Sequence, residues 1–220
     1  MTERDEKKTV CVYSSSSDAV EHKYLELASE TGRLMGENNY DLVYGGGNVG
    51  LMGKLASAAQ KAGSKVIGVI PEQLMGFNIE FSDSDELIIT KTMHERKALM
   101  IKRADAFIAL PGGFGTLEEW FEVVTQKQLG YHKKAIVLIN AYGFYDKLLE
   151  FLKQIFSSKF AKLDYQKLYK VCMNPSESIK MLEEYEYEPI PRKWFKNLVE
   201  NQKEIDEVKG SSVFDQRSCD

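Results

Sequence analysis

Cysteine is scarce in this sequence: Cys11, Cys172 and Cys219 lie far apart in a chain of 220 residues. An odd number without a close pair argues against a disulfide framework and against a structural zinc site. Long apolar runs are also missing, since no stretch approaches the roughly 18 apolar residues that a membrane-spanning helix needs. The charged start, MTERDEKK, lacks the apolar core of a secretory signal. We therefore expect a cytoplasmic protein that does not contact a membrane.

An excess of positive charge is missing as well. The formal net charge is −4 at pH 7, whereas general nucleic-acid binders usually carry a basic balance or a basic stripe. Hydrophobic residues make up 43% of the chain and charged residues 28%, which is ordinary for a soluble globular protein. The length suits a single domain, and the charge argues against nucleic acid as a partner.

Short β-branched runs alternate with helical patterns from residue 9 onward. Most of the runs are apolar throughout, as strands covered on both faces require; they span 9–13, 40–44, 65–70, 86–90, 106–110 and 135–139. Helical patterns fall at 24–35, 50–62, 93–103, 116–129 and about 143–156. This alternation predicts an α/β fold, in which a doubly wound, mostly parallel sheet carries helices on both faces. Ligands of such sheets bind beyond the carboxyl ends of the strands.

The character of the sequence changes near residue 185. We predict a flexible N-terminus over 1–8, one domain over 9–185 and a C-terminal extension over 186–220. The extension is highly charged and contains two nearby prolines. One short helix is expected around Lys193–Asp206, and about the last ten residues are expected to be disordered.

A glycine-rich segment, YGGGNVGLMG at 44–53, follows the second predicted strand and opens a helix. Glycine permits positive φ and lets backbone N–H groups approach a ligand, and a helix N-terminus adds unpaired donors for an anion. We predict a phosphate site at Gly45, Gly46, Gly47 and Gly50; the alternative is a tight turn required only by packing. The spacing also fits GxGxxG, but a dinucleotide-binding motif should follow the first strand. There the chain has four serines at 14–17, of which Ser16 is a further candidate contact.

A second glycine-rich segment, PGGFGT at 111–116, lies between another buried strand and another helix. Thr116 is a good N-cap residue, and Glu119 three positions later would complete a capping box. That is the structural alternative for Glu119. However, Gly112, Gly113 and Gly115 exceed what a cap requires. Two such turns at strand ends of one sheet indicate a shared anion site.

Charged side chains accompany both turns. In the segment MHERK at 93–97, Arg96 and Lys97 are candidates to contact a phosphate; the alternative is a solvated helix surface. Glu118, Glu119 and Glu122 follow the second turn. A carboxylate beside a bound sugar phosphate can stabilise an oxocarbenium-like transition state and position water, as in glycoside hydrolysis.

Three segments together, GGGNVGLMG (45–53), MHERK (93–97) and PGGFGTLEE (111–119), resemble the LOG family. Its members are cytokinin riboside 5′-monophosphate phosphoribohydrolases, long mislabelled as lysine decarboxylases. The resemblance covers roughly residues 9–185 and implies a Rossmann-like fold. It also implies a homodimer with the active site near the subunit interface. The implied reaction is hydrolysis of N6-modified AMP, or AMP itself, to the free base and ribose 5-phosphate, without a metal or organic cofactor.

The resemblance further implies roles for individual residues. Arg96 and Glu119 look like the catalytic pair. The implied nucleotide-binding set is Lys97, Gly113, Phe114, Gly115, Thr116, Leu117, Glu118 and Thr125. One position departs from the family, since Ser15 stands where a glycine is usual and adds a side chain to that turn.

Two other functions are compatible with parts of the pattern. A non-catalytic carrier of a phosphorylated ligand, such as a molybdenum-cofactor carrier, would share the fold and the glycine turns. The presence of both Arg96 and Glu119 favours the enzyme over the carrier. A dinucleotide-dependent oxidoreductase would need its glycine motif after the first strand and leaves the second turn unused. A pyridoxal-phosphate decarboxylase finds no support, because no lysine is singled out.

Overall fold

A computed structural model describes residues 7–77 and 80–190. Contacts within the chain group the described residues up to Glu188 as one compact unit. The helix predicted around Lys193–Asp206 and the predicted disordered end lie outside the described residues, as do residues 1–6 of the predicted flexible start. The predicted domain limits therefore stay predictions.

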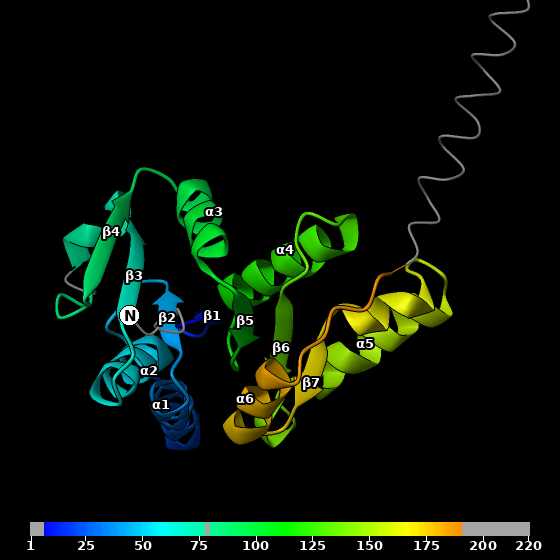
Figure 1. The fold of residues 1–220 in the computed structure, drawn as a ribbon, viewed down its shortest axis with the longest axis horizontal. Coiled ribbons are helices and arrows are strands. Elements are labelled where there is room, and N and C mark those ends of the chain that lie inside the picture. The colour runs from blue at the N-terminus through cyan, green and yellow to red at the C-terminus, as the bar shows by residue number, and fades with distance from the viewer. Residues whose placement is uncertain (1–6, 78–79, 191–220) are drawn as a thin grey trace, which may run out of the picture. The chain divides into compact units, whose positions relative to one another are not determined.

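In the described part of the chain, seven strands form one parallel sheet (Figure 1). The strands are β1 Thr9–Tyr13, β2 Asp41–Tyr44, β3 Val66–Pro71, β4 Glu86–Thr90, β5 Ala106–Ala109, β6 Ala135–Ile139 and β7 Lys170–Cys172. Their order is β4-β3-β2-β1-β5-β6-β7, and all neighbours run parallel. The α/β class and the parallel sheet predicted from the sequence are confirmed. The strand order reverses direction between β1 and β5, so a ligand is expected beyond the carboxyl ends of these two strands.

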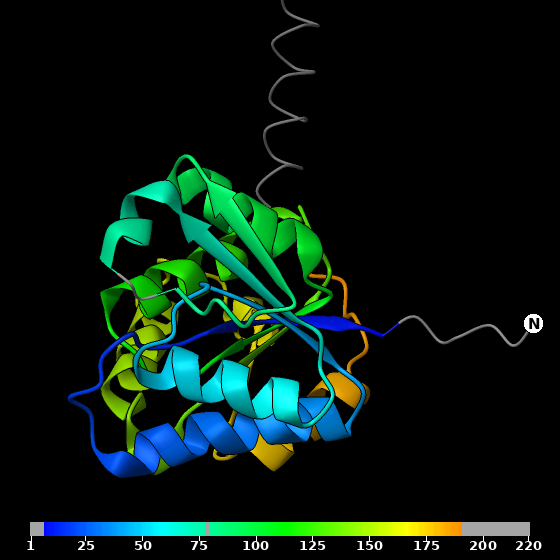
Figure 2. The ribbon, with the colours of Figure 1, turned by 90° about the vertical axis from the view of Figure 1, so that its left-hand side faces the viewer.

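Helices cover both faces of the sheet (Figures 1 and 2). They are α1 His22–Glu37, α2 Gly50–Lys61, α3 Met93–Arg103, α4 Phe114–Leu129, α5 Asp146–Ser157 and α6 Pro175–Glu183, with short 3₁₀ turns η1 Glu72–Phe77, η2 Ala141–Gly143 and η3 Leu163–Leu168. Helix α1 packs against α2 and α6, whereas α3 and α4 contact β1 from the other face. Among residues 7–77 and 80–190, no helix is long and apolar enough to cross a membrane.

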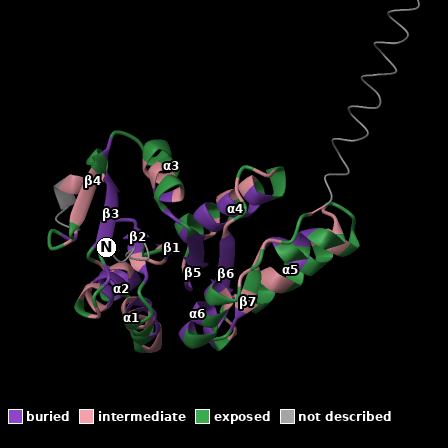
Figure 3. Cartoon of the chain, in the orientation of Figure 1, coloured by how far each residue is buried: buried purple, intermediate pink, exposed green. Residues whose placement is uncertain are grey.

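The central strands are buried because helices flank them on both sides. Every residue of β3, β5 and β6 is buried, whereas the edge strand β4 is mostly half-buried (Figure 3). On α1, the predicted apolar stripe faces the sheet: Leu27, Ala28, Thr31 and Met35 are buried. The stripe thus determines which side of α1 packs on the core.

The start of α4 differs from the prediction. The helix begins at Phe114 with Gly113 as its N-cap, and no side chain makes a cap hydrogen bond there. Thr116 is instead buried in the first turn, where its side chain packs over Gly112 so closely that a Cβ at 112 would lie 2.1 Å from Oγ1. The predicted Thr116 cap and the capping box with Glu119 are therefore wrong, and Glu119 is free for another role.

Some elements did not emerge from the sequence patterns. Strand β7 has three residues, too few to show a period. Helix α6 does carry a readable start signal: the side chain of Asn174 accepts from the Glu177 N–H (2.9 Å), and Pro175 occupies the first turn. The helix expected from about 143 is shorter than predicted, because η2 ends at Gly143 and α5 begins only at Asp146.

Candidate active site

A cavity of about 510 Å³ lies at the carboxyl ends of β1, β2, β3 and β5. Its walls come from both glycine-rich segments, from the serines after β1 and from α3 and α4. The lining residues are Ser14, Ser15, Ser16, Gly45, Gly47, Met52, Ile70, Leu74, Arg96, Gly113, Phe114, Gly115, Thr116 and Glu119. The two glycine segments, far apart in the sequence, thus face the same space beside the β1/β5 switch point.

Arg96 and Glu119 form a shielded ion pair inside this cavity. Arg96 extends from α3 and Glu119 from α4, and Nη1 of the arginine lies 3.1 Å from Oε1 of the glutamate. Only 13% and 9% of the two side chains are exposed. The Arg96 Nε–H also donates to the carbonyl oxygen of Val69 in β3 (3.1 Å). Strand and helix together therefore fix the guanidinium, which in turn fixes the carboxylate.

The environment of Glu119 holds its proton unusually tightly for a carboxyl group. Burial raises the pKa of Glu119 from its usual value of 4.5 to about 7; Arg96 opposes this rise, while Glu118 and Glu122 add to it. A carboxyl group with a pKa near neutrality can both take up and release a proton under ordinary conditions. Perturbed groups in a cavity are typical of functional sites.

The N-terminus of α4 lines the cavity with its first residues. Its first three residues, Phe114, Gly115 and Thr116, precede the first helical hydrogen bond, which Leu117 donates to the carbonyl of Gly113 (3.0 Å). The N–H groups of such a first turn have no partner within the helix. A Cβ added at Gly113 or Gly115 would meet nothing within 4 Å, so the backbone borders open space. A phosphate fits this position, where the helix dipole also favours negative charge.

The N-terminus of α2 is different, because the chain occupies it itself. The Gly50 N–H donates to Oδ1 of Asp18 (2.7 Å), and the Leu51 N–H donates to the carbonyl of Ser15 (3.0 Å). The prediction that this helix start offers free donors is therefore wrong for these amides. The loop after β1 folds over α2 and satisfies them, a contact that no local pattern reveals. Gly46 and Gly50 shape the turn with φ of 75° and 58°, which glycine adopts without strain.

The serines after β1 contribute polar groups to the cavity. Ser14, Ser15 and Ser16 all line it. The Ser14 hydroxyl oxygen is buried and has no hydrogen-bond partner among the described residues. The Ser15 hydroxyl accepts from the Ser17 N–H (3.1 Å). The extra side chain at 15 is thereby used to close the turn.

Several predicted binding residues do not line the cavity: Lys97, Gly112, Leu117, Glu118, Thr125, Gly46 and Gly50. The ammonium group of Lys97 lies between the carboxylates of Glu118 and Glu122 and is 3.0 Å from Oε2 of Glu122. These three side chains therefore tie α3 to α4 in the described chain. The sequence analysis in turn missed the apolar wall of Met52, Ile70 and Leu74, because apolar residues in strands and helices carry no signal that separates wall from core.

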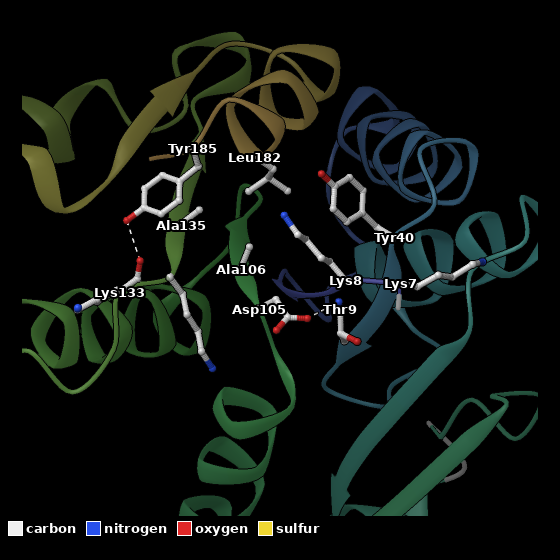
Figure 4. A pocket seen from close by; sticks show the side chains of 11 residues that line it. Lys7, Lys8, Thr9, Tyr40, Asp105, Ala106, Lys133, Ala135, Leu182 and Tyr185 are labelled. Carbon is white, nitrogen blue, oxygen red and sulfur yellow. Dashed lines mark hydrogen bonds between the residues drawn. The ribbon is translucent and has the colours of Figure 1, made fainter. Parts of the chain in front are cut away.

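A second cavity, of about 710 Å³, lies at the opposite end of the sheet (Figure 4). Its residues serve the fold: the Thr9 N–H donates to Asp105 (2.8 Å), and the Tyr185 hydroxyl donates to the carbonyl of Lys133 (2.8 Å). None of the predicted site residues lines it. Across both cavities and the rest of the described chain, no three His, Cys, Asp or Glu side chains cluster as metal ligands.

Comparison with known proteins identifies the family of this chain. A family model described as possible lysine decarboxylase matches residues 52–182. The chain is 43% identical over 181 residues to the cytokinin riboside 5′-monophosphate phosphoribohydrolase LOG7 of Arabidopsis thaliana, which covers 82% of this chain and 83% of that protein. The chain belongs to the LOG family. The family's enzyme LOG of Oryza sativa subsp. japonica is 44% identical over 187 residues, covering 84% of this chain and 77% of that enzyme.

Solved structures with the same fold carry other functions. The molybdenum cofactor binding protein of Rippkaea orientalis aligns with a TM-score of 0.63 at 22% identity, covering 81% of this chain and 97% of that one. The molybdenum cofactor carrier protein of Chlamydomonas reinhardtii aligns with a TM-score of 0.60 at 20% identity, over 81% and 96% of the two chains. At such identities the likeness shows the Rossmann-like fold alone.

Proposed function

We propose that this LOG-family protein hydrolyses the N-glycosidic bond of adenosine 5′-monophosphate or an N6-modified form of it. The products are the free base and ribose 5-phosphate. The observation that carries the proposal is the Arg96–Glu119 pair, joined at 3.1 Å, in the same cavity as the uncapped N-terminus of α4. The cavity volume of about 510 Å³ lies within the range of small-ligand sites.

The phosphate binds at the start of α4 and thereby places the ribose. The amides of Phe114, Gly115 and Thr116 donate to its oxygens, as helix N-termini do in other phosphate sites. Glu119 lies in the next turn of the same helix. A phosphate anchored at the first turn therefore sets the sugar beside this carboxylate, and unphosphorylated nucleosides lack that anchor.

The bond that breaks joins the anomeric carbon of the ribose to a ring nitrogen of the base. As it lengthens, its electron pair moves to the base and positive charge develops on the sugar. The Glu119 carboxylate stabilises this charge and accepts a proton from the attacking water, whose oxygen bonds to the anomeric carbon. The departing base nitrogen takes up a proton, so that water is consumed and no cofactor enters the balance. Arg96 holds Glu119 in place and favours its ionised form.

The other functions have less support. A pyridoxal-phosphate decarboxylase needs a lysine for its Schiff base, but no lysine among the described residues lines the cavity. A carrier needs no ionisable pair next to its ligand, whereas this cavity contains one.

We further propose a cytoplasmic homodimer that pairs through the outer side of α4. Phe114 is 95% exposed, and Phe121 and Leu129 on the same side are exposed as well. Glu118 and Thr125 share that side, since the five positions recur every three or four residues. A partner chain would cover the aromatic side chains and meet Glu118 and Thr125, which do not line their own chain's cavity. The thiols of Cys11 and Cys172 are free and buried, in keeping with a reducing compartment.

The test is to incubate the purified protein with AMP and with N6-isopentenyl-AMP, measuring the free base and ribose 5-phosphate. Adenosine is the matched control for the phosphate. We expect both products from a monophosphate and none from adenosine. Equal turnover of adenosine, or no release from either monophosphate, would contradict the proposal.

A further inference from the structure

Gly45 lies directly beneath the guanidinium group of Arg96. A Cβ built on Gly45 would stand 2.1 Å from Nη2 and 3.3 Å from Cζ of the arginine. The other close neighbour is the sulfur of Met52, at 3.1 Å. Gly45 is not among the glycines with positive φ, so its backbone conformation is open to any residue. The position therefore requires glycine for space and not for conformation.

We propose that Gly45 is a positioning residue: because it has no side chain, it leaves the space that the Arg96 guanidinium occupies when it holds Glu119. In this role Gly45 acts through Arg96 and does not present its amide to the phosphate. The catalytic consequence rests on the proposed hydrolase function, whereas the effect on Arg96 and Glu119 does not.

The neighbouring glycines have different roles, which makes Gly45 separable from them. Gly46 and Gly50 adopt positive φ, where an added side chain strains the backbone itself. At Gly53 a Cβ would lie 2.7 Å from the backbone of Asn48. At Gly45 the nearest atoms all belong to the ends of side chains. Alanine at 45 is therefore compatible with the fold, and the conflict is relieved by displacing Arg96.

Arg96 has little freedom to avoid such a side chain without losing contacts. Its Nε–H is bonded to the carbonyl of Val69 (3.1 Å), and its Nη1 is bonded to Glu119 (3.1 Å). A guanidinium group is planar and rigid, so lifting Nη2 away from residue 45 tilts the whole group. The contact with the Glu119 carboxylate is lost or lengthened as a result.

The pKa of Glu119 is a measure of this displacement. The charged groups that face it are Arg96 and Lys97 from α3 and Glu118 and Glu122 from its own helix, with the buried Cys11 and Tyr13 of β1 behind. Among these, Arg96 is the largest influence that lowers the Glu119 pKa. Moving the guanidinium away removes the largest opposing charge and leaves only Lys97 against burial and the two carboxylates, so the pKa of Glu119 rises above its wild-type value.

The test compares Gly45→Ala, Arg96→Ala and the double variant. The readouts are the Glu119 pKa from carboxyl-carbon NMR, thermal unfolding, and kcat and KM for AMP. We expect Gly45→Ala to raise the Glu119 pKa and to lower kcat about 100-fold, the scale of a 1 Å misplacement, with KM nearly unchanged. In the Arg96→Ala background, adding Gly45→Ala should change neither the pKa nor the unfolding temperature.

Three results would overturn the inference: an unchanged Glu119 pKa in Gly45→Ala, a rise in KM in place of the fall in kcat, or an equal loss of stability with and without Arg96. Should Gly45→Ala alone fail to fold, folding of the double variant supports the inference and its failure refutes it. If the wild-type protein does not hydrolyse AMP, the proposed function fails. The titration and unfolding data then still decide the role of Gly45.

Discussion

Replacing Glu119 with glutamine separates the effect of this carboxyl group on stability from its effect on catalysis. The Glu119→Gln variant keeps the shape and can still accept the Arg96 hydrogen bond, but it cannot ionise. Folded Glu119 titrates near pH 7 because it is buried, whereas the group titrates near 4.5 when it is free. Between these two values the folded protein therefore holds more protons than the unfolded chain, and rising pH reduces stability.

The size of the effect follows from the two pKa values. They differ by about 2.5, and one pKa unit corresponds to about 1.4 kcal/mol. Between pH 5 and pH 8, linkage predicts that the wild type loses about 2.5 kcal/mol of unfolding free energy relative to Glu119→Gln. The loss levels off above pH 7, where folded Glu119 is ionised. The variant should gain stability at high pH but lose activity. Removing an acid–base group typically lowers the rate 10²–10⁴-fold, so we expect its kcat to fall by about that factor.

Urea unfolding at pH 5 and pH 8 measures the stability difference, and ribose 5-phosphate release measures the rate. Glu150→Gln on α5 is the matched control for the substitution itself, since its carboxylate is more than half exposed and is not among the groups that act on Glu119. The reasoning is refuted if the stability difference for Glu119→Gln does not change with pH. It is equally refuted if this variant loses stability at both pH values and keeps its turnover, as a purely structural glutamate would.

Three further predictions concern the two helix starts and the outer side of α4. Phe114→Pro removes one amide donor at a position where proline is tolerated; we expect KM for AMP to rise roughly tenfold over Phe114→Ala, the value of one charge-assisted hydrogen bond. Asp18→Ala leaves the Gly50 amide without its partner, so urea unfolding should show a loss of about 1 kcal/mol in unfolding free energy, as for other caps. KM for AMP should stay unchanged; a large rise in KM would mean that the start of α2 does bind the phosphate. Phe121→Asp should convert a dimer to monomers in sedimentation, whereas Phe160→Asp, at an exposed aromatic side chain remote in sequence from α4, should not.

Much of the fold was readable because it follows from local patterns. Thr9–Tyr13 and Ala135–Ile139 are strongly apolar runs, and both are interior strands with the predicted bounds. The apolar stripe of α1 predicted its buried side. Strand β7 and the late start of α5 depend on tertiary contacts that a short segment does not encode.

The charged pair and the glycines of the site could be predicted from the sequence, but the roles of the individual glycines could not. The predicted neighbours Arg96 and Glu119 do meet, across 23 positions of sequence. Which helix start stays open was not predictable, because the carboxylate that closes α2 comes from Asp18, 32 positions earlier. Likewise, the contact between Gly45 and Arg96 exists only once β2 and α3 are folded together.

The most direct test of the account is a crystal structure of Glu119→Gln soaked with AMP. We predict the phosphate on the amides of Phe114, Gly115 and Thr116, with the anomeric carbon facing the side chain at 119. A phosphate bound at the lysine-lined cavity of Figure 4, or a nucleotide whose sugar points away from residue 119, would contradict it.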